Sequence, residues 1–235
     1  MSNHLIQQIA IMVLPLLFAV TLHEAAHAWV ADQKGDSTAR MLGRITLNPW
    51  VHTDLFGTII IPLLLFATTG FIFGYAKPVP VNPFHLRRPK QDMAWVAAAG
   101  PGMNLLLAVI SGLLYRVILL IYPQLYTLGG AGSFSSSGGL ISAFFVPLLL
   151  MLRFSVDINI LLMVFNLIPI PPLDGGRVLV GILPDRQSRF IGQIEPYGML
   201  VMIVLVFMDP FGLMRRFVWP LVSIFTGYIF GESVI

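Results

Sequence analysis

The chain has 235 residues, of which 57% are hydrophobic and only 11% charged, and its mean hydropathy is +0.84. Soluble domains carry about 25% charged residues, so this composition excludes an ordinary soluble protein and indicates one embedded in a lipid bilayer. The net charge of +3 comes from basic residues dispersed among loops, which favours contact with anionic lipid head groups and argues against nucleic acid as a partner.

Six apolar segments follow one another along the chain, and each is close to the length that a bilayer core requires. They are residues 5–30, 57–74, 93–122, 140–169, 190–208 and 212–231. The first is expected to remain in the protein as a helix, because no positively charged region precedes it as in a signal peptide. We therefore predict an all-α polytopic membrane protein with a single domain over residues 1–235, made of a core at 5–180 and accessory helices at 190–231.

The loops between these segments differ in charge, and the difference predicts their side of the membrane. Each of the loops at 31–56, 75–92 and 171–190 contains at least three lysines or arginines, whereas the loop at 123–137 contains no charge. The positive-inside rule places the first three in the cytoplasm and the fourth outside. The segment at 57–74 then cannot cross the membrane once. It is predicted to re-enter, which leaves five crossings and an extracytoplasmic N-terminus.

Two local features accompany this re-entrant segment. The residues at 43–49 precede it, and their pattern predicts a short strand or β-hairpin that leads into a turn. Pro62 and the Thr68-Thr69-Gly70 sequence are expected to break a helix within it. The alternative is a sixth crossing at 57–74, which contradicts the charge rule. With five crossings, the three motifs described next share one membrane depth, near the cytoplasmic face.

The first motif, His23-Glu24-Ala25-Ala26-His27, lies at the inner end of the first apolar segment. On a helix, positions i and i+4 share a face, so both imidazoles can reach one metal ion. Glu24 projects about 100° further round the helix, where its carboxylate can act on a water molecule. A polar cluster that only ties helices together is the alternative, but two histidines and a glutamate within one turn exceed that purpose.

Asp174 is the best candidate for a third ligand, because a catalytic zinc usually has three protein ligands and an open position. The chain contains no cysteine, so only His, Asp and Glu can serve. Asp174 lies in the segment 166–177, where prolines interrupt the helix and Gly175 and Gly176 let the backbone approach closely. Asp174 can also act as a helix N-cap, alone or in addition to binding metal.

Other polar residues in this apolar chain have a structural and a functional interpretation. Asn104, which ends the sequence Gly-Pro-Gly-Met-Asn at 100–104, and Asn166 can hydrogen-bond between helices or take part in the site. His52 and Asp54 could form a second metal site or a gate, but a turn followed by a helix start is favoured there.

Taken together, the motifs at 23–27, 100–104 and 166–177 resemble the site-2 protease family of intramembrane zinc metalloproteases, and they occur in the order of that family. The resemblance covers residues 5–180. The chain departs from better-known members because it has no PDZ domain between core spans and has an extra apolar stretch and basic loop at 57–92. It is similar to a minimal branch of the family.

The resemblance also implies roles for particular residues. It implies one zinc ion per chain, bound by the side chains of His23, His27 and Asp174. Glu24 is then the general base. Asn166 is implied to be catalytic and to bind the substrate strand or the developing oxyanion. Asn104 falls on the polar position of a family motif and is a further candidate for binding the substrate.

The function implied by the resemblance is a zinc-dependent intramembrane endopeptidase in the cell membrane. Its partners are then single-span membrane protein substrates and the lipid bilayer. A metal transporter or metal sensor with the same ligands is one alternative, and a catalytically inactive membrane scaffold is another. Transporters usually show repeated halves and a site at the bilayer midplane, and this sequence shows neither. A scaffold would have no need of Glu24.

Overall fold

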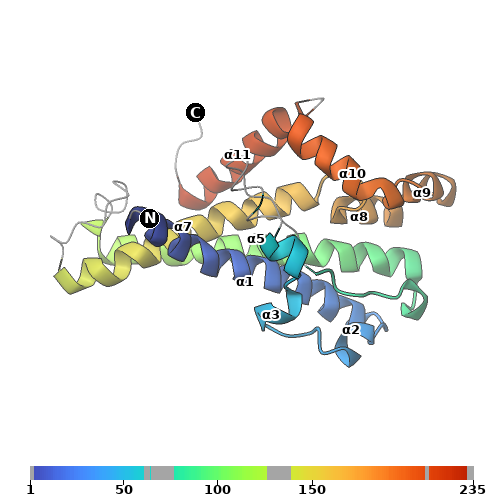
Figure 1. Ribbon diagram of the computed structural model, residues 1–235, viewed down its shortest axis with the longest axis horizontal. Coiled ribbons are helices and arrows are strands. Elements are labelled where there is room, and N and C mark those ends of the chain that lie inside the picture. The colour runs from blue at the N-terminus through green and yellow to red at the C-terminus, as the bar shows by residue number, and fades with distance from the viewer. Residues whose placement is uncertain (1–2, 61–63, 65–76, 126–138, 210–211, 232–235) are drawn as a thin grey trace. The chain divides into compact units, whose positions relative to one another are not determined.

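The computed structural model describes residues 3–60, 64, 77–125, 139–209 and 212–231, and every regular element within these ranges is a helix (Figure 1). The predicted all-α class is confirmed for this part of the chain. In order, the elements are α1 (Asn3–Gln33), α2 (Thr38–Met41), α3 (Pro49–His52), η1 (Leu55–Ile60), η2 (Pro83–His85), α5 (Pro89–Ile121), α7 (Gly139–Asn166), α8 (Asp174–Ile182), α9 (Asp185–Gly192), η4 (Glu195–Tyr197), α10 (Gly198–Ile203), η5 (Val204–Met208), η6 (Met214–Val218) and α11 (Trp219–Phe230).

Among the residues that the structure describes, three helices are long and apolar enough to cross a membrane: α1 over Gln7–Gln33, α5 over Pro89–Ile121 and α7 over Gly139–Asn166. About 20 residues of helix suffice for a bilayer core, and each of these helices exceeds that length. A fourth span is added if the bent pair Asp185–Tyr197 and Leu200–Met208 is counted as one. The first, third and fourth predicted apolar segments are therefore confirmed as long membrane-type helices.

One compact unit of the chain contains Met1–Ala19, Asn104–Asn166 and Met199–Ile235. Within it, α11 packs against α7 (Figure 1) and directly continues η6 in the chain. Polar side chains also join α5 to α7 in this unit, where the hydroxyl oxygens of Ser111 and Ser155 lie 2.8 Å apart. Such bonds are characteristic of helix packing in lipid, because the hydrocarbon core contains no water that could hydrogen-bond an unpaired polar group.

The second compact unit contains Val20–Met103 and Leu167–Gly198. It therefore holds the C-terminal half of α1, the start of α5, and the short helices α8 and α9, which pack against each other. Its small hydrophobic cluster centres on the buried side chains of Ala31, Leu86 and Val96. This unit carries the two histidines and Asp174.

The short strand or β-hairpin predicted at 43–49 is wrong. Gly43 adopts a positive φ of 66° and donates its N–H to the Arg40 carbonyl at 3.0 Å, which ends α2. Asn48 then caps α3, its side chain accepting from the Trp50 N–H at 3.1 Å. The main-chain groups of this segment are therefore hydrogen-bonded to nearby residues. No strand in the described ranges could pair with it, so the segment forms turns instead of a strand.

The predicted re-entrant segment at 57–74 lies mostly outside the described residues. Only its beginning, within η1 (Leu55–Ile60), and Leu64 are described. The number of crossings and the side of the N-terminus therefore stay predictions.

A segment without helix or strand over residues 77–82, which we call the strap, precedes η2. Asp36 holds its far end: the fully buried Asp36 carboxylate accepts from the Asn82 N–H at 2.6 Å and the Thr38 N–H at 3.1 Å. The same carboxylate lies 3.2 Å from Nδ1 of His85. Burial by itself would raise the pKa of Asp36, but these hydrogen bonds together hold the pKa below its ordinary value.

Candidate metal centre

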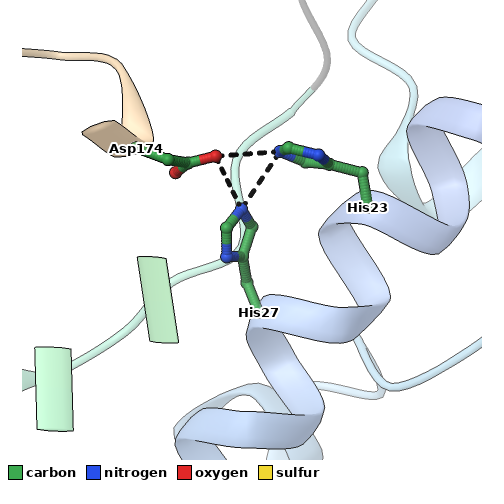
Figure 2. A group of neighbouring side chains, drawn as sticks. All are labelled: His23, His27 and Asp174. Carbon is green, nitrogen blue, oxygen red and sulfur yellow. Dashed lines mark hydrogen bonds and ion pairs between the residues drawn. The ribbon is translucent and has the colours of Figure 1, made fainter. Parts of the chain in front are cut away.

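His23 and His27 lie one turn apart on the same face of α1, as their spacing predicted, and both are buried. Their rings approach edge to face, with the two Nε2 atoms 3.1 Å apart. Asp174 reaches them from the start of α8, and Figure 2 shows the three side chains converging on one point. Its Oδ2 lies 3.2 Å from Nε2 of His23 and 3.3 Å from Nε2 of His27.

Asp174 is the first residue of α8, following Leu173 at the N-cap position, and the cap makes no side-chain hydrogen bond. The N-cap interpretation of Asp174 is therefore wrong, and the carboxylate is directed to the histidines instead. Two glycines allow α8 to begin so close to the preceding loop. A Cβ on Gly175 would lie 2.2 Å from the Leu167 carbonyl oxygen, and one on Gly176 would lie 2.4 Å from the Pro171 nitrogen.

Val96, on α5, orients the His27 imidazole. Its carbonyl oxygen lies 2.7 Å from Nδ1 of His27, so the proton of the neutral ring is on Nδ1 and the lone pair on Nε2 faces Asp174. A metal-bound histidine is typically oriented in this way by a carbonyl or carboxylate at its other nitrogen.

The donor set fits a zinc ion. Two ligand atoms at about 2.0–2.1 Å from a tetrahedral zinc lie about 3.3 Å apart, close to the spacings between these three atoms. Within the described part of the chain, the buried Oδ2 of Asp174 has no hydrogen-bond partner besides its close approach to the two imidazoles, and a cation at this point would stabilise the three converging electron-rich atoms. Burial alone would raise the pKa of the Asp174 carboxyl, but the neighbouring imidazoles of His23 and His27 hold it well below its usual range.

Glu24 directly follows His23 on α1 and is half-buried. Its Oε2 accepts a hydrogen bond from the main-chain N–H of Val79, in the strap, at 3.1 Å. α1 therefore carries two imidazoles and one carboxylate within five residues, and the Val79 N–H restrains the carboxylate. Nothing in the sequence marked Val79, because a main-chain N–H has no side-chain signature.

Gly100 makes room for the histidine pair. A Cβ at this position of α5 would lie 2.4 Å from Nε2 of His27 and 2.6 Å from Cε1 of His23, closer than any real carbon contact. In the sequence, the motif at 100–104 drew attention only to Asn104, and this role of Gly100 was missed. The available signal was a glycine inside an apolar helix, which costs about 1 kcal/mol relative to alanine and so calls for a reason.

Asn104 and Asn166 belong to the other compact unit. Asn104 is fully buried, and its amide donates to Oδ1 of Asn159 at 2.8 Å and to the Ala19 carbonyl at 3.3 Å. These bonds agree with the interpretation of Asn104 as a helix-tying residue. Asn166 donates to the Leu162 carbonyl of its own helix at 3.0 Å. Their roles toward a substrate stay predictions.

His52 and Asp54 follow the structural interpretation. Oδ1 of Asp54 accepts from the N–H groups of Phe56 and Gly57, at 3.0 and 2.7 Å, and so starts η1. His52 is buried with Nε2 3.1 Å from the Thr46 carbonyl oxygen. Among the described residues, the one cluster of metal-binding side chains is His23, His27 and Asp174.

Comparison with known proteins gives one consistent result. The family model described as "Peptidase family M50" matches residues 11–208. A Bacillus subtilis protein named "Putative zinc metalloprotease YwhC" is 37% identical over 90% of this chain and 85% of its own length. Proteins named "Putative zinc metalloprotease Rip2" from Mycolicibacterium smegmatis and Mycobacterium tuberculosis are 28% and 26% identical, over 81% and 80% of this chain but only 64% and 63% of theirs. No solved structure matches the chain significantly.

Proposed function

Because the chain belongs to peptidase family M50, the site-2 protease family, and is a zinc metalloprotease of that family, we propose that it is an endopeptidase that cleaves transmembrane segments inside the bilayer. The observation that carries this proposal is the buried trio His23, His27 and Asp174: the two histidines lie on the apolar helix α1, Asp174 begins α8, and all three belong to one compact unit. A hydrolytic centre on an apolar helix can act on a peptide bond that bulk water does not reach.

In this proposal the three side chains bind one zinc ion and Glu24 is the general base. When bound, zinc would act as a Lewis acid that lowers the pKa of water towards about 7. Glu24 accepts the proton of the attacking water and then delivers it to the leaving amine. Asn166 is proposed to bind the substrate strand or the developing oxyanion. Asn104 is a weaker candidate for substrate binding, since its amide is already engaged between helices.

The proposed arrangement in the membrane is a single protease domain with five crossings, the N-terminus outside and the segment 57–74 re-entering. Three long apolar helices and the basic loops at 31–56, 75–92 and 171–190 support it. This topology brings the catalytic residues near the cytoplasmic face of the cell membrane. The substrates are proposed to be single-span membrane proteins, because their helices enter the bilayer core without a surrounding bundle.

A cleavage assay in detergent or liposomes tests the proposal, with zinc content measured in parallel. We expect the wild type to cut single-span substrates, Glu24→Gln to retain zinc without cutting, and Asp174→Ala to lose zinc. Glu195→Gln is the matched control, because it makes the same chemical change in an exposed ion pair with Arg177. A wild type that binds zinc but cuts nothing, on substrates that another family member cleaves, would contradict the proposal and favour a scaffold or transporter.

A further inference from the structure

The strap has a sequence that dictates its shape. It begins Lys77-Pro78-Val79-Pro80, and Asn82 is again followed by a proline. Proline fixes its own φ near −65° and pushes the preceding residue into an extended conformation. Residues 77–82 accordingly contain no helix or strand, and the backbone at Asn82 is extended, with φ −99° and ψ 105°. A segment built in this way is stiff before it makes any contact with the rest of the protein.

Main-chain hydrogen bonds fasten this stiff segment at both ends. The Lys77 N–H donates to the His52 carbonyl at 2.9 Å, and the Asn82 N–H donates to the buried Asp36 carboxylate at 2.6 Å. A few residues later, the Arg87 N–H donates to the Lys34 carbonyl at 3.1 Å. The strap is thereby held against the C-terminal part of α1 and the residues that follow it, all within one compact unit.

Between these fastenings, a single amide faces the proposed general base. Pro78 and Pro80 have no N–H, so Val79 is the only donor in that three-residue stretch. Its N–H lies 3.1 Å from Oε2 of Glu24. A hydrogen bond to a carboxylate is roughly twice as strong as one between neutral groups, and Glu24 and Val79 are both partly buried here.

We propose that the main-chain N–H of Val79 is a positioning group of the protease: it holds Oε2 of Glu24 and leaves Oε1 to take the proton of the attacking water. This inference rests on the proposed function of Glu24. A free glutamate side chain samples many rotamers, and ordering it costs conformational entropy. The pinned, proline-stiffened strap orders this side chain before the substrate arrives, which lowers the barrier of the proton-transfer step.

Two substitutions of the same residue separate the amide from the side chain. Val79→Pro removes the N–H and keeps the extended backbone, whereas Val79→Ala keeps the N–H and removes two methyl groups. We expect kcat of Val79→Pro to fall about tenfold to a hundredfold, with KM and zinc content unchanged. We expect Val79→Ala to remain within about twofold of the wild type in kcat. Equal losses in the two variants would overturn the proposal.

A double-mutant cycle tests whether the effect passes through Glu24. Glu24→Asp shortens the side chain by one methylene and withdraws its carboxylate from the strap. In that background Val79→Pro is expected to reduce kcat by no more than about twofold further, because the bond it removes is already lost. The same loss in both backgrounds would overturn the proposal, since the strap would then act independently of the base.

A spectroscopic measurement keeps the proposal testable even if Val79→Pro does not fold. In protein labelled with ¹⁵N-valine, Val79→Ala identifies the Val79 amide resonance. We expect this amide proton to move upfield in Glu24→Gln and to stay in place in the surface control Glu195→Gln. An unchanged Val79 resonance in Glu24→Gln would overturn the hydrogen bond. This readout does not depend on cleavage, so failure of the proposed function and failure of this inference are distinguishable.

Discussion

Replacing Gly100 by alanine tests the geometry of the metal centre most directly. The added methyl carbon would lie 2.4 Å from Nε2 of His27 and 2.6 Å from Cε1 of both His23 and His27. Non-bonded heavy atoms need about 3.5 Å, so the imidazoles must retreat by roughly 1 Å. His27 cannot simply rotate away, because its Nδ1 is held 2.7 Å from the Val96 carbonyl oxygen.

A retreat of this size is large for a zinc site. Ligand distances are met to within about 0.2 Å in natural sites, and a misplacement of about 1 Å near the reacting centre can reduce activity about a hundredfold. We therefore expect Gly100→Ala to weaken zinc binding by about a hundredfold or more and to abolish cleavage at limiting zinc. Competition with a chromophoric chelator measures the affinity, and metal analysis of the purified protein measures the occupancy.

Gly102→Ala is the matched control on the same helix. A Cβ at Gly102 would meet nothing within 4 Å, so this substitution adds the same methyl group in open space. Alanine favours a helix over glycine by up to about 1 kcal/mol, and the control is expected to be neutral or slightly stabilising with full zinc content. If Gly100→Ala were as stable and as rich in zinc as Gly102→Ala, the close packing of α5 against the histidines would be refuted.

Three further predictions concern Asp36, Gly175 and Asn104. Asp36→Asn is expected to lower the free energy of unfolding by about 1–3 kcal/mol at pH 7. Because the pKa of Asp36 is lower in the folded protein than in the unfolded chain, the carboxylate stabilises the fold above the unfolded pKa, and this contribution is lost as the pH falls through the folded pKa. Thermal melts of the wild type and the variant should therefore converge below about pH 4. Gly175→Ala, whose Cβ would strike a carbonyl at 2.2 Å, should lose zinc and melt earlier, while Gly192→Ala, with nothing within 4 Å, should match the wild type. Asn104→Ala should lower stability by about 0.6–1.7 kcal/mol and leave KM unchanged; a raised KM with unchanged stability would instead assign Asn104 to substrate binding.

Local patterns in the sequence were enough to predict the long helices and the pairing of the two histidines. Hydrophobic length and the i, i+4 spacing act within one helix, so no distant residue is needed to interpret them. Asp174 could also be nominated in advance, since a carboxylate set among Pro169, Pro171, Pro172 and two glycines lies where a membrane helix must unwind.

The tertiary structure decided what depends on residues far apart in the chain. The strand at 43–49 was predicted from an alternating pattern, but a strand requires a partner, and none lies in the described ranges. The space for the imidazoles depends on Gly100, and the hydrogen bond to Glu24 comes from the main chain of Val79.

The candidate metal ligands and the candidate base can therefore be identified from the sequence. Their placement depends on a glycine, which has no side chain, and on a main-chain amide. A glycine contributes by the methyl group it lacks, and an amide is present at every residue except proline. Neither carries a residue-specific signal, so only the folded arrangement reveals which glycine and which amide the metal centre uses.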